Sequence, residues 1–202
     1  MSKRRIILAS RSPRRKALLE QVGLDFEVRE SEYEEDMQAL EDPIELVKFL
    51  ALKKAEDVAK HYDDAIVIGA DTFVVYDNKF IGKPKDAVDA QRILKMLSGQ
   101  ENTIVTGFAV IDTVSGKVVN SCDKATIKIR KLSDEDIDSY IATGEPLDKA
   151  GAFGIQGVGA VIVERVDGDY HNIMGLPLSK LYDELKNMGV DILASSARHL
   201  KK

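Results

Sequence analysis

The sequence is poor in cysteine and contains no tryptophan. Its one cysteine, Cys122, excludes an internal disulfide and a multi-cysteine zinc site, and it fits a reducing compartment. The histidines at 61, 171 and 199 lack metal-ligand spacing, and no Walker A, G-x-G-x-x-G or H-E-x-x-H motif is present. The sequence therefore lacks the usual signatures of a P-loop enzyme, a dinucleotide-binding enzyme and a zinc protease.

The chain also lacks a long apolar run. The start MSKRR resembles the charged end of a signal peptide, but only IILA follows before polar residues resume. No window reaches the length of a transmembrane helix, and the net charge of −5 argues against non-specific binding of nucleic acid. We therefore expect a cytoplasmic protein that has neither a membrane nor a nucleic acid as partner.

The 202 residues are enough for one domain with a real core. We expect a single domain over 1–193 and a frayed, basic tail over 194–202. Apolar alternation, caps and turn residues predict an α/β fold. Strands are expected at residues 6–8, 26–31, 65–69, 73–76, 79–81, 103–112, 117–131 and 159–165, and helices at 13–22, 43–62, 86–97, 134–143 and 178–188.

The stretch LASRSPRR, residues 8–15, joins the first strand to the first helix. Ser12 followed by a proline is typical of a helix start, which leaves free backbone N–H groups at the turn. Ser10, Arg14 and Arg15 crowd the same turn, and arginine forks match phosphate oxygens two at a time. The stretch indicates either a polyphosphate cradle or an ordinary N-cap with two solvated arginines.

Other charged residues are placed by the elements that carry them. Lys54 falls inside the apolar arc of its helix, but so does Lys48, and the helical angle does not choose between them. Asp71 follows the buried strand AIVIG, at the end where open α/β sheets place their chemistry, although an aspartate that caps a loop is also common there. Lys83 is flanked by glycine and proline, which indicates a directed side chain or a plain turn.

A late loop, residues 146–157, contains three glycines together with Asp148, Lys149 and Gln156. Glycines in this number indicate that the backbone approaches something closely. Cations and hydroxyls suited to a triphosphate, with carboxylates suited to Mg²⁺ or Mn²⁺, amount to a phosphoanhydride-cleaving site. The candidate residues are Ser10, Ser12, Arg14, Arg15, Glu35, Lys54, Asp71, Thr72, Lys83, Asp148, Lys149 and Gln156.

An ordered series of motifs carries a resemblance to a known family. The series is S-x-S-P-R-R, an acidic loop, L-x-x-K-A, G-A-D-T, G-K-P, D-K-A-G-x-x-G-I-Q-G and G-L-P. It resembles the Maf family of nucleoside triphosphate pyrophosphatases from Leu8 to about Leu185. The resemblance implies an elongated mixed β-sheet flanked by helices, with two lobes and a central cleft, similar to inosine triphosphate pyrophosphatases. It also implies a divalent metal, Mg²⁺ or Mn²⁺, and a homodimer.

The resemblance further implies roles for individual residues. Asp71 is the expected proton acceptor, or holds the metal together with Glu35, for which Glu34 is a close rival. The expected phosphate-binding residues are Ser10, Ser12, Arg15, Lys54 and Lys83. The residues expected to set substrate choice are Arg14, Thr72 and Gln156.

The G-I-Q-G form of the late motif resembles the branch that acts on dTTP and UTP. A physical reason supports this branch, because a Gln156 amide complements the N3–H and O4 of thymine and uracil, whereas cytosine lacks that N3–H. The expected reaction releases pyrophosphate and clears dTTP, UTP and modified pyrimidine triphosphates. The alternatives are a nucleotide-binding regulator of septum formation without essential catalysis, and a pyrophosphatase for 7-methyl-GTP or for ITP and XTP.

Overall fold

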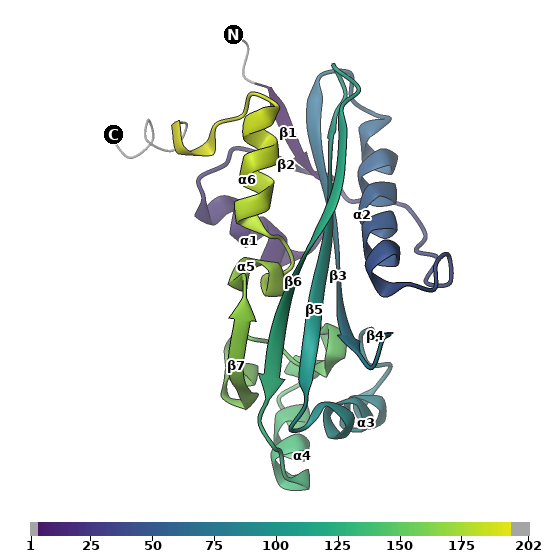
Figure 1. The fold of residues 1–202 in the computed structure, drawn as a ribbon, viewed down its shortest axis with the longest axis vertical. Coiled ribbons are helices and arrows are strands. Elements are labelled where there is room, and N and C mark those ends of the chain that lie inside the picture. The colour runs from purple at the N-terminus through teal and green to yellow at the C-terminus, as the bar shows by residue number, and fades with distance from the viewer. Residues whose placement is uncertain (1–3, 195–202) are drawn as a thin grey trace.

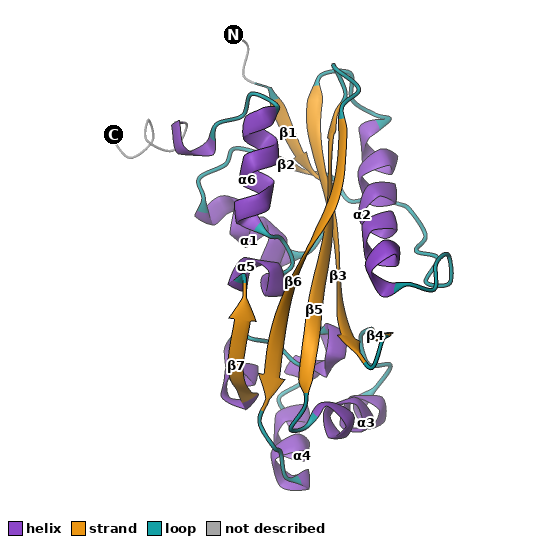
Figure 2. Cartoon of the chain, viewed as in Figure 1, coloured by secondary structure: helices purple, strands orange, loops and turns teal. Residues whose placement is uncertain are grey.

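The computed structural model describes residues 4–194, and its fold is a mixed α/β arrangement around one long sheet (Figures 1 and 2). The strands are β1 (Arg5–Leu8), β2 (Glu27–Val28), β3 (Ala65–Tyr76), β4 (Lys79–Ile81), β5 (Glu101–Asp112), β6 (Val118–Ile129) and β7 (Val163–Gly168). The helices are α1 (Pro13–Gln21), α2 (Pro43–Ala59), α3 (Ala87–Leu97), α4 (Asp134–Ala142), α5 (Tyr170–Met174) and α6 (Leu178–Asn187). Short 3-10 helices are η1 (Glu145–Asp148), η2 (Ala150–Ala152) and η3 (Gly157–Ile162).

The described strands form a 7-stranded sheet in the order β2-β1-β3-β5-β6-β7, with β4 added beside β3. β1 pairs in parallel with β2 and β3, and the other pairings are antiparallel. The predicted elongated mixed sheet flanked by helices is therefore confirmed. Between residues 4 and 194, no helix is long and apolar enough to cross a membrane.

Side chains on the long strands alternate between two helical layers. On one face, Ile66, Ile68 and Phe108 pack with residues of α1 and α6. On the other face, Val67 and Ala109 pack with α2. This alternation follows from the two-residue period of a strand, and Figure 1 shows α1 and α6 on the side of the sheet opposite to α2.

A second core lies at the other end of the same strands. Val74, Ile104 and Ile127 pack there with residues of α3, α4 and the 3-10 helices. Because β3, β5 and β6 run through both cores, the two expected lobes share one sheet, as Figure 1 shows. Ala70 belongs to the first core and Val74 to the second, so the segment of β3 between them lies at the junction.

Several predicted boundaries are wrong. The strand expected to end at Gly69 continues to Tyr76, because β5 pairs with it without interruption from Ile66 to Val75. Asp71 therefore lies inside a strand and not after one. The strand expected over 159–165 is instead the 3-10 helix η3 followed by β7, which extends to Gly168. The short helix α5 was not predicted, and the expected tail lies outside the described residues except for Ala194.

Candidate active site

The turn between β1 and α1 forms as predicted. The Ser12 hydroxyl is the N-cap of α1 and accepts a hydrogen bond from the Arg15 backbone N–H at 3.5 Å. The Ser10 hydroxyl accepts from the Ser12 backbone N–H at 3.2 Å. Pro13 at the first helical position needs no hydrogen-bond partner, which suits this start. The two serines therefore build the turn itself, and their oxygens lie beside the backbone amides at the positive end of the helix.

Arg15 lies buried beneath this turn, with 9% of its surface exposed. Its Nε–H donates to the Gly175 carbonyl at 2.8 Å, and its terminal nitrogens donate to the hydroxyls of Ser10 (3.2 Å) and Thr72 (3.1 Å). Among the described residues it forms no ion pair with a carboxylate. Burial lowers the pKa of Arg15, against the raising effect of the nearby Asp71 charge. The alternative of two solvated arginines is thus wrong for Arg15.

This guanidinium has donors to spare. Three of its five N–H groups are used by neutral oxygens, so the remaining donors and the whole positive charge are left for an anion. A buried cation without an acid partner is costly in an isolated protein. Such a group is typical of a site that receives a phosphate or carboxylate from a ligand.

Lys54, Asp71 and Glu35 form the second part of the site. The Lys54 ammonium lies 3.0 Å from Asp71 Oδ1 and 2.7 Å from Glu35 Oε1. The Lys54 and Asp71 side chains are only 13% and 12% exposed, whereas that of Glu35 is 44% exposed. Asp71 Oδ2 is buried and has no hydrogen-bond partner among the described residues. One oxygen of this carboxylate is therefore held by a lysine while the other is left unused.

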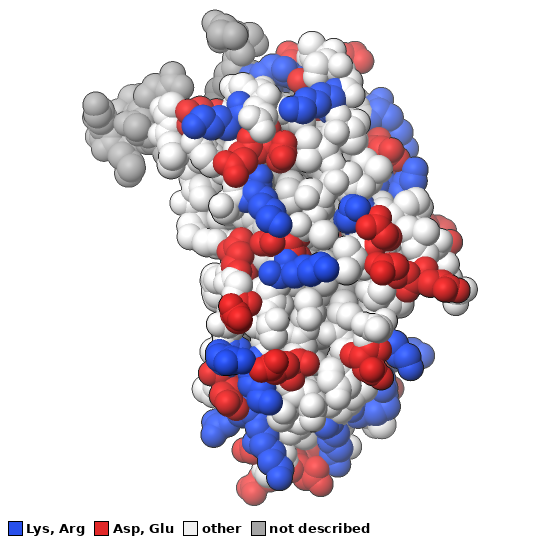
Figure 3. Space-filling view, viewed as in Figure 1, with Lys and Arg blue, Asp and Glu red and all other residues white. Residues whose placement is uncertain are grey.

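The structure decides between the rivals that the sequence left open. Lys48 forms an ion pair with Glu45 at 2.9 Å, so Lys54 is the lysine of the apolar arc that reaches β3. Glu35 makes the contact with Lys54, whereas Glu34 is exposed and forms no hydrogen bond or ion pair with any residue from 4 to 194. Figure 3 shows acidic side chains gathered over the loop that leads into α2, which supplies this carboxylate.

Two glycines set the height of α2 above the sheet. A Cβ atom at Gly69 would lie 2.4 Å from the Ala51 carbonyl oxygen, and one at Gly107 would lie 2.5 Å from the Val47 carbonyl oxygen. Gly107 pairs with Asp71 in the register of β3 and β5. The helix backbone thus packs directly on the strand backbone, and this close approach brings Lys54 within reach of Asp71.

A directed chain of hydrogen bonds begins at Arg15. The Thr106 hydroxyl donates to the Asn172 carbonyl at 2.7 Å, so its proton is used. The Thr72 hydroxyl, 3.0 Å away, must then donate to Thr106, while it accepts from Arg15. Toward a bound molecule, the Thr72 oxygen can therefore only accept. Thr106 and Asn172 were not predicted, because nothing in their local sequence marks them.

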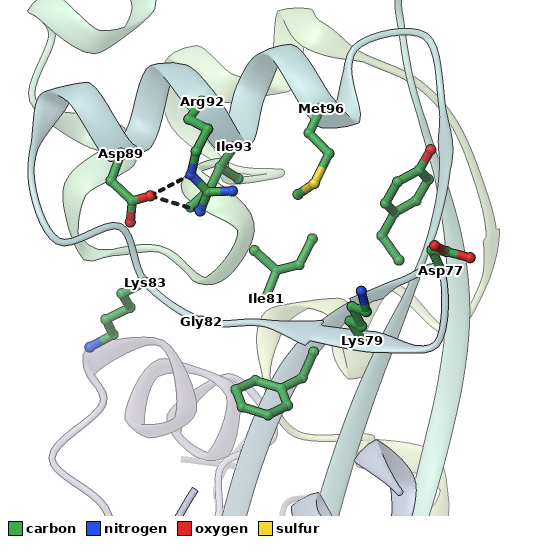
Figure 4. A pocket seen from close by; sticks show the side chains of 11 residues that line it. Asp77, Lys79, Ile81, Gly82, Lys83, Asp89, Arg92, Ile93 and Met96 are labelled. Carbon is green, nitrogen blue, oxygen red and sulfur yellow. Dashed lines mark hydrogen bonds and ion pairs between the residues drawn. The ribbon is translucent and has the colours of Figure 1, made fainter. Parts of the chain in front are cut away.

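Arg14 and Lys83 both act electrostatically on Asp148. The pKa of Asp148 is lowered: burial opposes this, but an ion pair with Lys149 and the charges of Arg14 and Lys83 outweigh it. Lys83 borders a pocket of about 320 Å³ between β4 and α3. Figure 4 shows its ammonium pointing away from Ile81 and toward the N-terminal segment drawn in purple. Lys149, Arg14 and Lys83 thus all act on this one exposed carboxylate.

Gln156 takes part in none of the contacts described above. Its side chain is exposed and makes no hydrogen bond to any residue in the described range. The loop around it, residues 154–159, is bound by Glu145 and Tyr140, which were not predicted as functional residues. The only sequence feature that could have indicated Glu145 is its position directly before Pro146, at the start of the late loop. The close approach expected of the glycines is made to this internal carboxylate by Gly157, and to the Val74 side chain by Gly151.

A divalent cation fits part of this donor set. No group of three or more His, Cys, Asp or Glu residues that could hold a metal occurs between residues 4 and 194. The two carboxylates bridged by Lys54, with the unused oxygen of Asp71, match a site in which substrate phosphates complete the coordination. Asp71 and Glu35 are therefore the residues that could hold Mg²⁺ or Mn²⁺.

A buried arginine at a helix start, with carboxylates beside a lysine, is typical of α/β proteins that bind phosphate groups.

Comparison with known proteins gives relatives whose names fit such a site. The profile of the family described as "Maf-like protein" matches residues 5–188. A protein of Dictyoglomus turgidum named "dTTP/UTP pyrophosphatase" is 50% identical over 192 residues, which cover 95% of this chain and 100% of the relative. One of the same name from Bacillus cereus is 46% identical over 189 residues, 94% of this chain and 98% of the relative. The chain belongs to the Maf-like protein family.

Proposed function

We propose that this chain is a nucleoside triphosphate pyrophosphatase that hydrolyses dTTP and UTP between the α and β phosphates. The products are the nucleoside monophosphate and pyrophosphate. The names of the relatives support the activity, and the observation that carries it here is Arg15, a buried cation with no acid partner in the described structure. A triphosphate supplies the missing negative charge.

The residues around Arg15 are assigned separate roles in binding and in catalysis. Ser10, Ser12 and Arg15 bind phosphate oxygens at the N-terminus of α1, and Lys83 binds them from the rim. Lys54 holds Oδ1 of Asp71 and orients the carboxylate. Asp71 Oδ2, which has no hydrogen-bond partner within residues 4–194, accepts the proton of the attacking water.

A divalent cation held by Asp71 and Glu35 would neutralise charge on the phosphate oxygens during the reaction. The protein side of this arrangement is the pair of carboxylates that Lys54 bridges at 2.7 Å and 3.0 Å. Lys54 would stay beside the two carboxylates and add its positive charge to that of the cation.

Nucleotide choice is assigned to Gln156, Arg14 and Thr72. The Gln156 amide offers a donor and an acceptor to uracil and thymine, and Thr72 offers an acceptor. A role in clearing dTTP, UTP and modified pyrimidine triphosphates from the cytoplasm, as a homodimer, follows from the family and stays a prediction.

The deciding experiment measures pyrophosphate release from a panel of nucleotides with Mg²⁺ and with Mn²⁺. We expect dTTP and UTP to be cleaved fastest, and Asp71→Asn to lower kcat by about 10³-fold while triphosphate binding persists. Asp63→Asn, an exposed change of the same kind, serves as the control. Fastest cleavage of ITP, XTP or 7-methyl-GTP would overturn the base assignment. Nucleotide binding without any hydrolysis would support a regulator instead.

A further inference from the structure

The loop from Gly154 to Gly159 is folded around an acid of the chain itself. Glu145 Oε2 accepts a hydrogen bond from the Val158 backbone N–H at 2.8 Å, and Oε1 accepts from the Gly159 N–H at 2.9 Å. The Tyr140 hydroxyl donates to Glu145 Oε1 at 2.9 Å and accepts from the Gly154 N–H at 3.2 Å. Two side chains thus hold both ends of the loop.

Glu145 and Tyr140 also leave little room for a side chain at two glycines of this loop. A Cβ atom at Gly157 would lie 2.5 Å from Glu145 Oε2, and its φ of +69° is one that other residues rarely adopt. A Cβ atom at Gly159 would lie 2.4 Å from the Tyr140 hydroxyl. The backbone amides that face Glu145 are therefore occupied and are not available to a phosphate.

The ionic state of the two side chains matches their roles. Burial opposes ionisation of Glu145, but the backbone N–H donors of Gly159 and Val158 outweigh it and lower the pKa of this carboxyl. Burial raises the pKa of Tyr140, so its hydroxyl keeps the proton that it donates. The contacts are thus made by an anion and a neutral phenol, a charge-assisted arrangement.

Gln156 lies in the middle of the segment that these bonds hold. Its backbone is extended, with φ −102° and ψ 162°, and its amide is exposed. Glu145 opens η1 and Asp148 closes it, so the same 3-10 helix joins this loop to the carboxylate that faces Arg14 and Lys83. Loosening the loop would free Gln156 and leave the phosphate contacts on α1 in place.

We propose that Glu145 is a positioning residue for nucleotide selectivity: with Tyr140 it holds the loop that presents the Gln156 amide to the base. The inference rests on the proposed function. A loop held in one conformation does not lose its freedom on binding, so the amide discriminates between bases at a lower entropic cost. Glu145 needs no contact with the substrate to act in this way.

The test is the variant Glu145→Gln. Glutamine keeps the shape of the side chain, but its –NH₂ group cannot accept a hydrogen bond from a backbone N–H. We expect the ratio of kcat/KM for UTP over CTP to fall about tenfold, with kcat for UTP within about threefold of the wild type. The matched control is Glu135→Gln, because Glu135 is an exposed acid of α4 that forms no hydrogen bond with residues 154–159 of the loop. Tyr140→Phe, which removes a hydroxyl from the same network, should give a smaller loss in the same direction.

A double-mutant cycle shows whether Glu145 acts through Gln156. If it does, Glu145→Gln should cost little selectivity in a Gln156→Ala background. Equal, multiplicative losses in both backgrounds would overturn the inference. So would an unchanged selectivity ratio in both Glu145→Gln and Tyr140→Phe.

A readout without catalysis separates this inference from the proposed function. Hydrogen exchange of the Val158 and Gly159 amides should quicken about tenfold or more in Glu145→Gln and stay unchanged in Glu135→Gln. Unchanged exchange would overturn the inference even in an active enzyme. A wild type that releases no pyrophosphate from any nucleotide would overturn the function, while a response in exchange would keep Glu145 as the residue that holds the loop.

Discussion

The turn before α1 and the loop around Gln156 differ in how a charged side chain is neutralised. At α1, a buried cation is surrounded by neutral oxygens and lacks an anion among the described residues. In the loop, exposed glycine-rich backbone encloses an anion that the chain supplies itself. The difference teaches that a sequence motif with charged residues can mark either a ligand site, as at α1, or a finished internal contact, as in the glycine-rich loop. Only the partners of each charge tell the two apart.

The largest effect expected in this comparison concerns Arg15. Arg15→Lys keeps the charge but loses the planar fork, so kcat/KM for UTP should fall about 100-fold. A non-hydrolysable analogue, α,β-imido-dUTP, should raise the melting temperature of the wild type and of Glu145→Gln, but not that of Arg15→Lys. Equal stabilisation of all three proteins would contradict the difference drawn between the two regions.

A second change concerns the loop alone. Gln156→Glu removes the amide donor, and we expect kcat/KM for dTTP and UTP to fall about tenfold relative to CTP. Steady-state kinetics on the nucleotide panel measures this ratio. The same loss on every nucleotide would show that the loop acts on rate and not on choice of base.

The smallest expected effect is on the stability of the folded protein at acid pH. It concerns a third charged group, the carboxylate of Asp112. Asp112 accepts hydrogen bonds from Arg4, from the Ser115 hydroxyl and from the Val114 and Ser115 amides. Burial opposes its ionisation, but these donors hold the pKa at about 2, below the ordinary 3.8. Like Glu145, it is an internal anion whose partners are already in place.

Because the folded-state pKa of Asp112 is depressed, its contribution to stability is present above pH 3.8 and is lost as the pH falls toward about 2. Urea unfolding of the wild type and of Asp112→Asn should therefore differ most near neutral pH and converge in acid. A difference that stays constant down to about pH 2.5 would show that the ionised carboxylate is not what stabilises this turn.

Much of the fold can be predicted from local patterns in the sequence. The serine–proline start of α1 and the approximate ranges of α2, β5 and β6 were predicted because each depends on neighbours in sequence. The break expected after Gly69 was wrong for a physical reason. That glycine looks like a strand end, but it is there because α2 packs on it, and β5 carries the strand onward.

The site was predicted as a set of residues, and less well as a set of contacts. Arg14 and Arg15 are adjacent and alike in sequence, yet one is half-exposed and the other is buried under Thr72. Thr106 and Glu145 act through partners far along the chain, which no local pattern encodes. Sequence therefore indicated the chemistry, and tertiary packing decided which groups are free to bind.

Gly69 and Gly107 limit how this chain can vary over evolution. Neither is assigned a contact with the nucleotide, but a single methyl at either would push α2 away and lift Lys54 from Asp71. Most of the atoms that such a methyl would meet are backbone atoms of α2, so a smaller side chain on the helix would not make room for it. Both positions are therefore expected to stay glycine wherever Lys54 has to reach Asp71.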